Sequence, residues 1–187
     1  EEGQALNAEL TLLLGASHLK VRQNNEGIRL LRELWWAKPY TQWSLRALRF
    51  LAHPDNNIYH HENALHIRKI LPDLSQSESS NKEPQIELQL GQLLNEITGQ
   101  DDLISEIYHA LGVIQLRKQK FDLAVATFNK SRRHSKNHEF ERVLKLHLGQ
   151  ALRHHGEFSN ALNLFQDVSN GYQDNYAEEA LSLAGES

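Results

Sequence analysis

The chain has 187 residues, of which 40% are hydrophobic and 24% are charged, and its formal net charge is −4 at pH 7. This balance is typical of a soluble globular protein, and it lacks the basic excess of proteins that bind nucleic acid or anionic membranes. No apolar run approaches the roughly 18 residues that span a bilayer, so no membrane insertion is expected. The sequence contains no cysteine, which excludes disulfides and thiolate metal sites and is compatible with the cytoplasmic location that we expect.

In the first part of the chain, apolar residues recur at helical spacing and are interrupted by prolines and polar stretches. This pattern predicts a helix pair over about 5–22 and 25–37, followed by a degenerate pair over about 40–52 and 58–70. The inner face of the first pair is expected to consist of Leu10, Leu13, Leu14, Leu31 and Leu34. The polar, serine-rich stretch 72–84 is bounded by prolines and is interpreted as a linker.

After the linker, helices are predicted over about 85–98, 102–118, 121–134, 139–155 and 158–169, with a capping helix over about 173–184. Nothing alternates with period two over a useful length, so no sheet is expected. The predicted organisation is therefore N-terminal helical repeats in 1–71, a linker in 72–84 and C-terminal repeats in 85–187, all of them α-helical.

Three stretches of the chain share one positional rule. Each has a Leu-Gly pair, a small residue twelve positions after the glycine, and a large apolar residue four positions further on. The members are Leu14, Gly15, Gly27 and Leu31 in the first stretch, Leu111, Gly112, Ala124 and Phe128 in the second, and Leu148, Gly149, Ala161 and Phe165 in the third. Small residues at fixed offsets allow two helices to approach closely, and bulky residues fill the space between successive pairs.

With these residues the chain resembles the tetratricopeptide repeat, a helix-turn-helix unit of about 34 residues. The resemblance implies a right-handed superhelical solenoid in which the first helix of each pair lines a concave groove. The groove positions that it assigns are Leu12, Ala16, Leu19 and Lys20 in the first repeat, Glu106, His109, Val113, Leu116 and Arg117 in the next well-formed one, and Val143, Leu146, Gln150, Arg153 and His154 in the last. A largely apolar groove with a basic row, Lys20, Arg117 and His154, suits an acidic or amphipathic segment of another protein.

Motifs of catalysis and of cofactor binding are lacking. The sequence has no glycine-rich phosphate loop, no GxSxG elbow and no nucleophilic cysteine. His134 and His138 have the i,i+4 spacing of a helical metal pair, but Arg132, Arg133 and Lys136 crowd them, and cations oppose a divalent ion. We therefore expect neither a metal nor another cofactor.

The tryptophan cluster allows two interpretations. Trp35 and Trp36 are about 100° apart on one helix, so one is expected to pack between repeats and the other to be partly exposed. Packing against the pair that carries Trp43 is the simpler interpretation, and a partner surface is the alternative.

The sequence as a whole favours a non-enzymatic module or scaffold that binds another protein. The alternative is an obligate structural subunit of a larger complex, whose groove is already occupied and whose helix backs carry exposed apolar patches. An enzyme would instead require a deep pocket with converging titratable groups.

Overall fold

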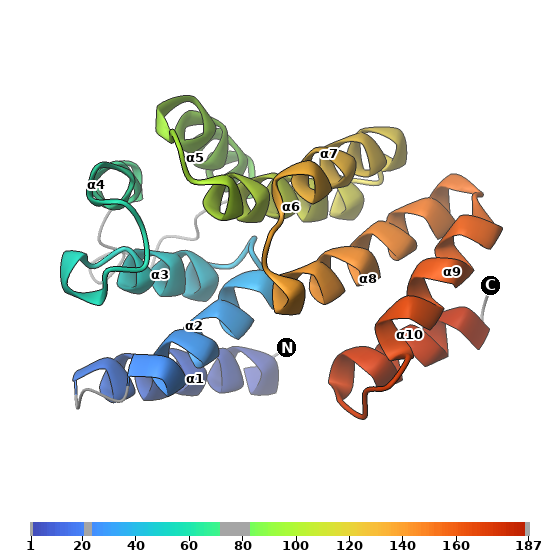
Figure 1. Cartoon of the computed structure of the whole chain (residues 1–187), viewed down its shortest axis with the longest axis horizontal. Coiled ribbons are helices and arrows are strands. Elements are labelled where there is room, and N and C mark those ends of the chain that lie inside the picture. Colours follow the sequence, from blue (N-terminus) through green and yellow to red (C-terminus); the bar gives the residue numbers. More distant parts are fainter. Residues whose placement is uncertain (1, 21–23, 72–82, 186–187) are drawn as a thin grey trace. The chain divides into compact units, whose positions relative to one another are not determined.

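The structure is a computed structural model, and it describes residues 2–20, 24–71 and 83–185. These residues form ten α-helices and one 3-10 turn, with no β-strand among them, which confirms the predicted all-α fold. The helices are α1 (Glu2–Lys20), α2 (Asn24–Ala37), α3 (Gln42–Leu51), α4 (His61–Ile70), α5 (Glu83–Glu96), α6 (Asp101–Arg117), α7 (Phe121–His134), α8 (His138–His155), α9 (Phe158–Ser169) and α10 (Asn175–Gly185) (Figure 1). Within the described ranges, no helix is both long and apolar enough to cross a membrane.

The helices pack mainly on their neighbours in sequence, and they gather into two compact units, 1–100 and 101–187. The boundary follows Gln100, whereas the sequence analysis placed a linker at 72–84, most of which lies outside the described residues. Helix α5 belongs to the first unit because it packs on α4. The side-chain amide of Asn63, at the start of α4, donates to the carbonyl oxygen of Thr98 at 3.0 Å and so holds the end of α5 in place.

In the first unit, α1 packs on α2 through a different face from the one predicted. Leu12 is only 4% exposed, while Leu10, Leu13 and Leu14 are 51–57% exposed, so their assignment to the inner face was wrong. The close approach of the two helices sets this phase. A Cβ atom added to Gly27 would lie 2.8 Å from the carbonyl oxygen of Gly15. Neighbouring residues in a helix are about 100° apart, so turning Gly15 toward α2 turns Leu13 and Leu14 away from it.

Both adjacent tryptophans are buried. Trp35 and Trp36 lie in the core of the first unit, and Trp43 is half-buried with the guanidinium of Arg46 4.9 Å from its ring centroid. The expected partial exposure of one tryptophan was wrong because α2 packs on both α1 and α3, which covers two faces of the helix. The packing interpretation therefore holds for this pair.

The second unit repeats its architecture after 37 residues, since α6, α8 and α10 begin at Asp101, His138 and Asn175. The caps repeat as well. The Asn137 side chain accepts hydrogen bonds from the N–H groups of Glu139 and Phe140 at the start of α8. The carboxylate of Asp174, 37 residues further on, accepts one from the N–H of Ala177 in α10.

The contacts inside the two helix pairs also correspond. Ser105 in α6 donates its hydroxyl to the carbonyl oxygen of Ser131 in α7 at 2.7 Å. At the equivalent place, Arg142 in α8 donates to the carbonyl oxygen of Val168 in α9 at 3.0 Å. The pairs α6–α7 and α8–α9, which lie side by side in Figure 1, are thus two copies of one helix-turn-helix unit, and α10 packs on α9 as α8 packs on α7.

Candidate functional site

The groove positions assigned from the repeat pattern differ in exposure. Leu12, His109, Val113 and Leu146 are buried, as are Glu106 and Val143. Half-buried positions are Ala16, Leu19, Leu116, Gln150 and Arg153, while Lys20, Arg117 and His154 are exposed. Leu12, Ala16, Leu19 and Lys20 belong to the first unit and the others to the second. Within the second unit, the surface therefore offers the ends of α6 and α8 rather than their middles.

His109 is buried because it belongs to an aromatic cluster between α6 and α8. Its Nε2 lies 2.8 Å from Nδ1 of His147, and its ring centroid lies 5.2 Å from that of Phe140. Burial lowers the pKa of both imidazoles, that of His147 to about 4, because the interior penalises the charged ring. At neutral pH both rings are uncharged, and one donates to the other. No short motif indicated this pair, since its members are separated by one repeat plus one residue.

The predicted histidine pair does not converge on a common point. His134 Nδ1 lies 3.2 Å from a carboxylate oxygen of Asp101, whereas the side chain of His138 is 98% exposed. Lys136 also binds Asp101, with Nζ at 2.7 Å, and this contact is the main reason that the pKa of the Asp101 carboxyl is lowered. Within the described ranges, no group of three or more His, Cys, Asp or Glu residues is placed to hold a metal ion.

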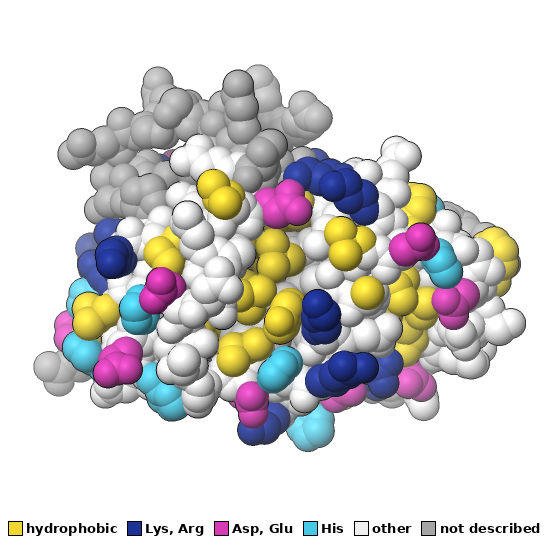
Figure 2. Space-filling model, turned by 90° about the horizontal axis from the view of Figure 1, so that it is seen from above, with side chains coloured by type: hydrophobic (Ala, Val, Ile, Leu, Met, Phe, Trp, Pro, Cys, Tyr) yellow, Lys and Arg dark blue, Asp and Glu magenta, His cyan; other side chains and the backbone are white. Residues whose placement is uncertain are grey.

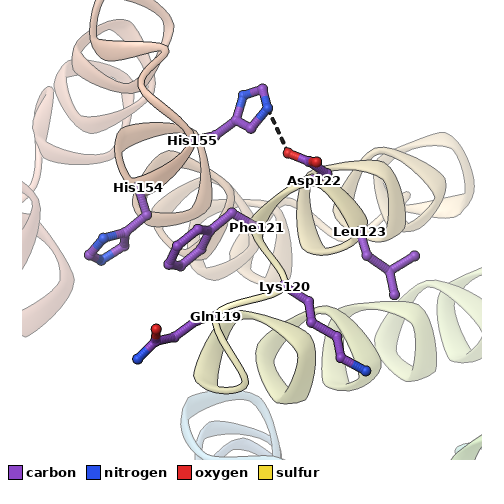
Figure 3. Close-up of a pocket in the computed structure, with 7 residues that line it drawn as sticks. All are labelled: Gln119, Lys120, Phe121, Asp122, Leu123, His154 and His155. Atoms are coloured by element: carbon purple, nitrogen blue, oxygen red, sulfur yellow. Dashed lines mark ion pairs between the residues drawn. The ribbon is translucent and has the colours of Figure 1, made fainter.

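A hollow of about 420 Å³ opens where the turn between α6 and α7 meets the last turn of α8 (Figure 3). The turn is tight because Gln119 adopts a left-handed conformation (φ 57°) and the N–H of Lys120 donates to the carbonyl oxygen of Gln115. The ring of Phe121 stacks on that of His154, with centroids 5.0 Å apart and planes inclined by 12°. The lining residues are Gln119, Lys120, Phe121, Asp122, Leu123, His154 and His155.

The carboxylates beside the hollow are occupied by one histidine. His155 Nε2 lies 2.7 Å from Asp122, and its Nδ1 lies 3.1 Å from Glu157. Asn160 donates to the second oxygen of Glu157 at 2.6 Å. By contrast, the Lys120 ammonium and the His154 ring nitrogens have no hydrogen-bond or ion-pair partner in the described part of the chain. The hollow therefore presents two basic groups beside an aromatic ring.

A second hollow of about 450 Å³ lies on the first unit, along a face of α5 lined by Glu87, Leu88, Gly91, Gln92 and Asn95. All its lining residues come from one helix, and no ring or ion pair is built across it from another described element. It therefore offers an open helix face rather than converging groups.

Comparison of the chain with models of protein families, with curated proteins and with solved structures finds no match. The fold alone therefore defines the class, which is an all-helical protein whose helices pack in sequential pairs.

Proposed function

We propose that the protein is a non-enzymatic interaction module whose tetratricopeptide-like repeats stack as a right-handed solenoid and bind a segment of another protein. The observation that carries this proposal is the correspondence of α6–α7 with α8–α9, which extends from the helix starts to the Ser105 and Arg142 contacts. Stacked repeats place equivalent residues side by side and create extended surfaces that commonly bind partners. The step from this fold to binding is an analogy.

The partner is expected to contact the first helices of the pairs at their exposed ends. Leu116 and Arg117 at the end of α6, and Arg153 and His154 at the end of α8, are the accessible groove positions of the second unit. Gln150 already donates its amide to Glu179 of α10 at 2.9 Å. Basic and apolar groups together suit an acidic or amphipathic segment, and the proposal needs no cofactor.

Affinity capture with charge-reversed variants tests this function. The parent protein, Arg117→Glu and Arg153→Glu are immobilised, with Arg133→Glu as control because this exposed arginine lies in the last turn of the second helix α7. We expect mass spectrometry to find proteins that the parent and the control retain and that both groove variants lose. Identical retention by all four proteins would remove the support for the groove.

The exposed leucines of α1 favour a second candidate function, that of an obligate subunit of a larger complex. Leu10, Leu13 and Leu14 are each about half exposed at i, i+3 and i+4 spacing, which makes a continuous apolar strip. Other apolar side chains also reach the surface, and on the face drawn in Figure 2 they are interspersed with basic and acidic ones. Sedimentation velocity separates the two functions. A free module stays monomeric as its concentration rises, whereas a subunit of this kind self-associates until Leu13→Gln weakens the strip.

A further inference from the structure

The hollow at the turn between α6 and α7 combines apolar and basic groups. Its floor contains the Phe121–His154 stack, and Leu123 beside it is 48% exposed. In the view of Figure 3, His154 and Lys120 lie on opposite sides of Phe121. A ligand that covers the aromatic ring with an apolar group would thus have a basic side chain on either side of that contact.

The charge around the hollow favours an acidic ligand. Four basic residues, Arg117, Lys118, Lys120 and Arg153, stand at the ends of α6 and α8, against two carboxylates, those of Asp122 and Glu157. Both carboxylates contact His155, which reduces their repulsion of an approaching anion. Charge complementarity of this kind steers encounter and selects among partners more than it adds to affinity.

We infer that this hollow binds an acidic segment of a partner protein, with a large apolar side chain on Phe121 and Leu123 and carboxylates beside Lys120 and His154. The inference rests on the proposed interaction function and adds to it the place and the chemistry of the ligand. The occupied surface is the edge formed by the α6–α7 turn and the end of α8, next to Arg117 and Arg153.

Three labelled peptides of equal length provide the probe. Each has a central leucine, flanked by glutamates in the first, glutamines in the second and lysines in the third. Fluorescence polarisation with the full chain is expected to show saturable binding of the glutamate peptide at least about tenfold tighter than that of the other two. Amide shifts in a nuclear magnetic resonance titration should be largest at Phe121, Leu123 and His154.

Matched variants locate the site. Lys120→Glu and His154→Ala are expected to weaken the glutamate peptide by about fivefold or more. Lys69→Glu, an exposed lysine on α4, and His138→Ala, a fully accessible histidine, should leave the affinity unchanged. Circular dichroism shows whether each variant retains the parent's helix content.

Two results overturn the inference. One is failure of the glutamate peptide to bind better than the glutamine peptide, and the other is equal binding by the parent and the Lys120→Glu protein. If either occurs while the Arg117→Glu and Arg153→Glu variants still lose the captured partners, the hollow is not the ligand site but the proposed function stands. If no groove variant loses a partner either, both proposals fail.

Discussion

Gly149 and Phe165 are in such close contact that a Cβ atom on the glycine would lie 2.5 Å from Cε1 of the ring. The same relationship holds one repeat earlier, where a Cβ on Gly112 would lie 2.6 Å from Cε1 of Phe128. Both phenylalanines are fully buried, so neither ring has free space into which it can move. Each glycine therefore permits the helix crossing in its pair.

This contact predicts that Gly149→Ala destabilises the protein. Despite the higher helix propensity of alanine, overpacking against Phe165 is expected to cost about 1–3 kcal/mol of unfolding free energy. Gly91→Ala in α5 is the matched control, because a Cβ there has no neighbour within 4 Å. This control should be neutral or stabilising by up to about 1 kcal/mol. Urea titrations of both variants measure the difference, and equal effects would contradict the close packing.

The phase of α1 predicts opposite results for two neighbouring leucines. Leu12→Ala removes a buried side chain and should cost about 2–4 kcal/mol, whereas Leu13→Ala should cost less than about 1 kcal/mol. Thermal and urea unfolding of the two variants provide the comparison. The reverse order would restore the inner face that the apolar spacing alone suggests.

Arg142 predicts how α10 is attached. Its guanidinium donates two bonds to Asp174, at 2.7 and 3.1 Å, and lies 3.5 Å from the ring centroid of Tyr172. Arg142→Met should cost about 1–3 kcal/mol and speed amide exchange in α10, because it removes three contacts and leaves the carbonyl of Val168 without this donor. Arg133→Met, at an exposed position, is the control. Unchanged exchange in α10 would show that other contacts hold the helix.

The buried imidazole pair predicts acid sensitivity. The pKa of His109 and that of His147 are lower in the folded chain than the ordinary value of 6.5, and that of His147 is about 4. Between these values the unfolded chain binds more protons, so stability is complete above about pH 6.5 and falls as the pH approaches 4. We expect a loss of about 1–3 kcal/mol over this interval, discounted because His147 keeps part of its surface exposed.

A double variant, His109→Leu with His147→Leu, separates this pair from the other histidines. Replacing both partners by apolar groups removes the titration without leaving one ring unpaired. Urea titrations at several pH values should show a flatter dependence for the variant than for the parent. An equally steep dependence would assign the acid sensitivity to other groups.

The sequence predicts the helices well, because apolar spacing and breakers act locally. The expected helix over 121–134 coincides with α7, and the other helix ends differ by a few residues. The phase of α1 was missed because three leucines at helical spacing resemble a core face, whereas the Gly15–Gly27 contact decides which side is covered. The His109–His147 pair and the hollow beside Phe121 depend on how α8 packs against the preceding pair, and no local pattern contains that information.

The most direct test of the proposed function is a binding titration with a segment of a captured partner, comparing the parent with Arg117→Glu at low and high salt. Arg117 is exposed, so reversing its charge should change folding stability by less than about 0.5 kcal/mol. We predict weaker binding by the variant and a smaller decrease in affinity as salt increases. If the variant instead matches the parent in affinity and in salt dependence, the partner does not bind along the groove at the end of α6.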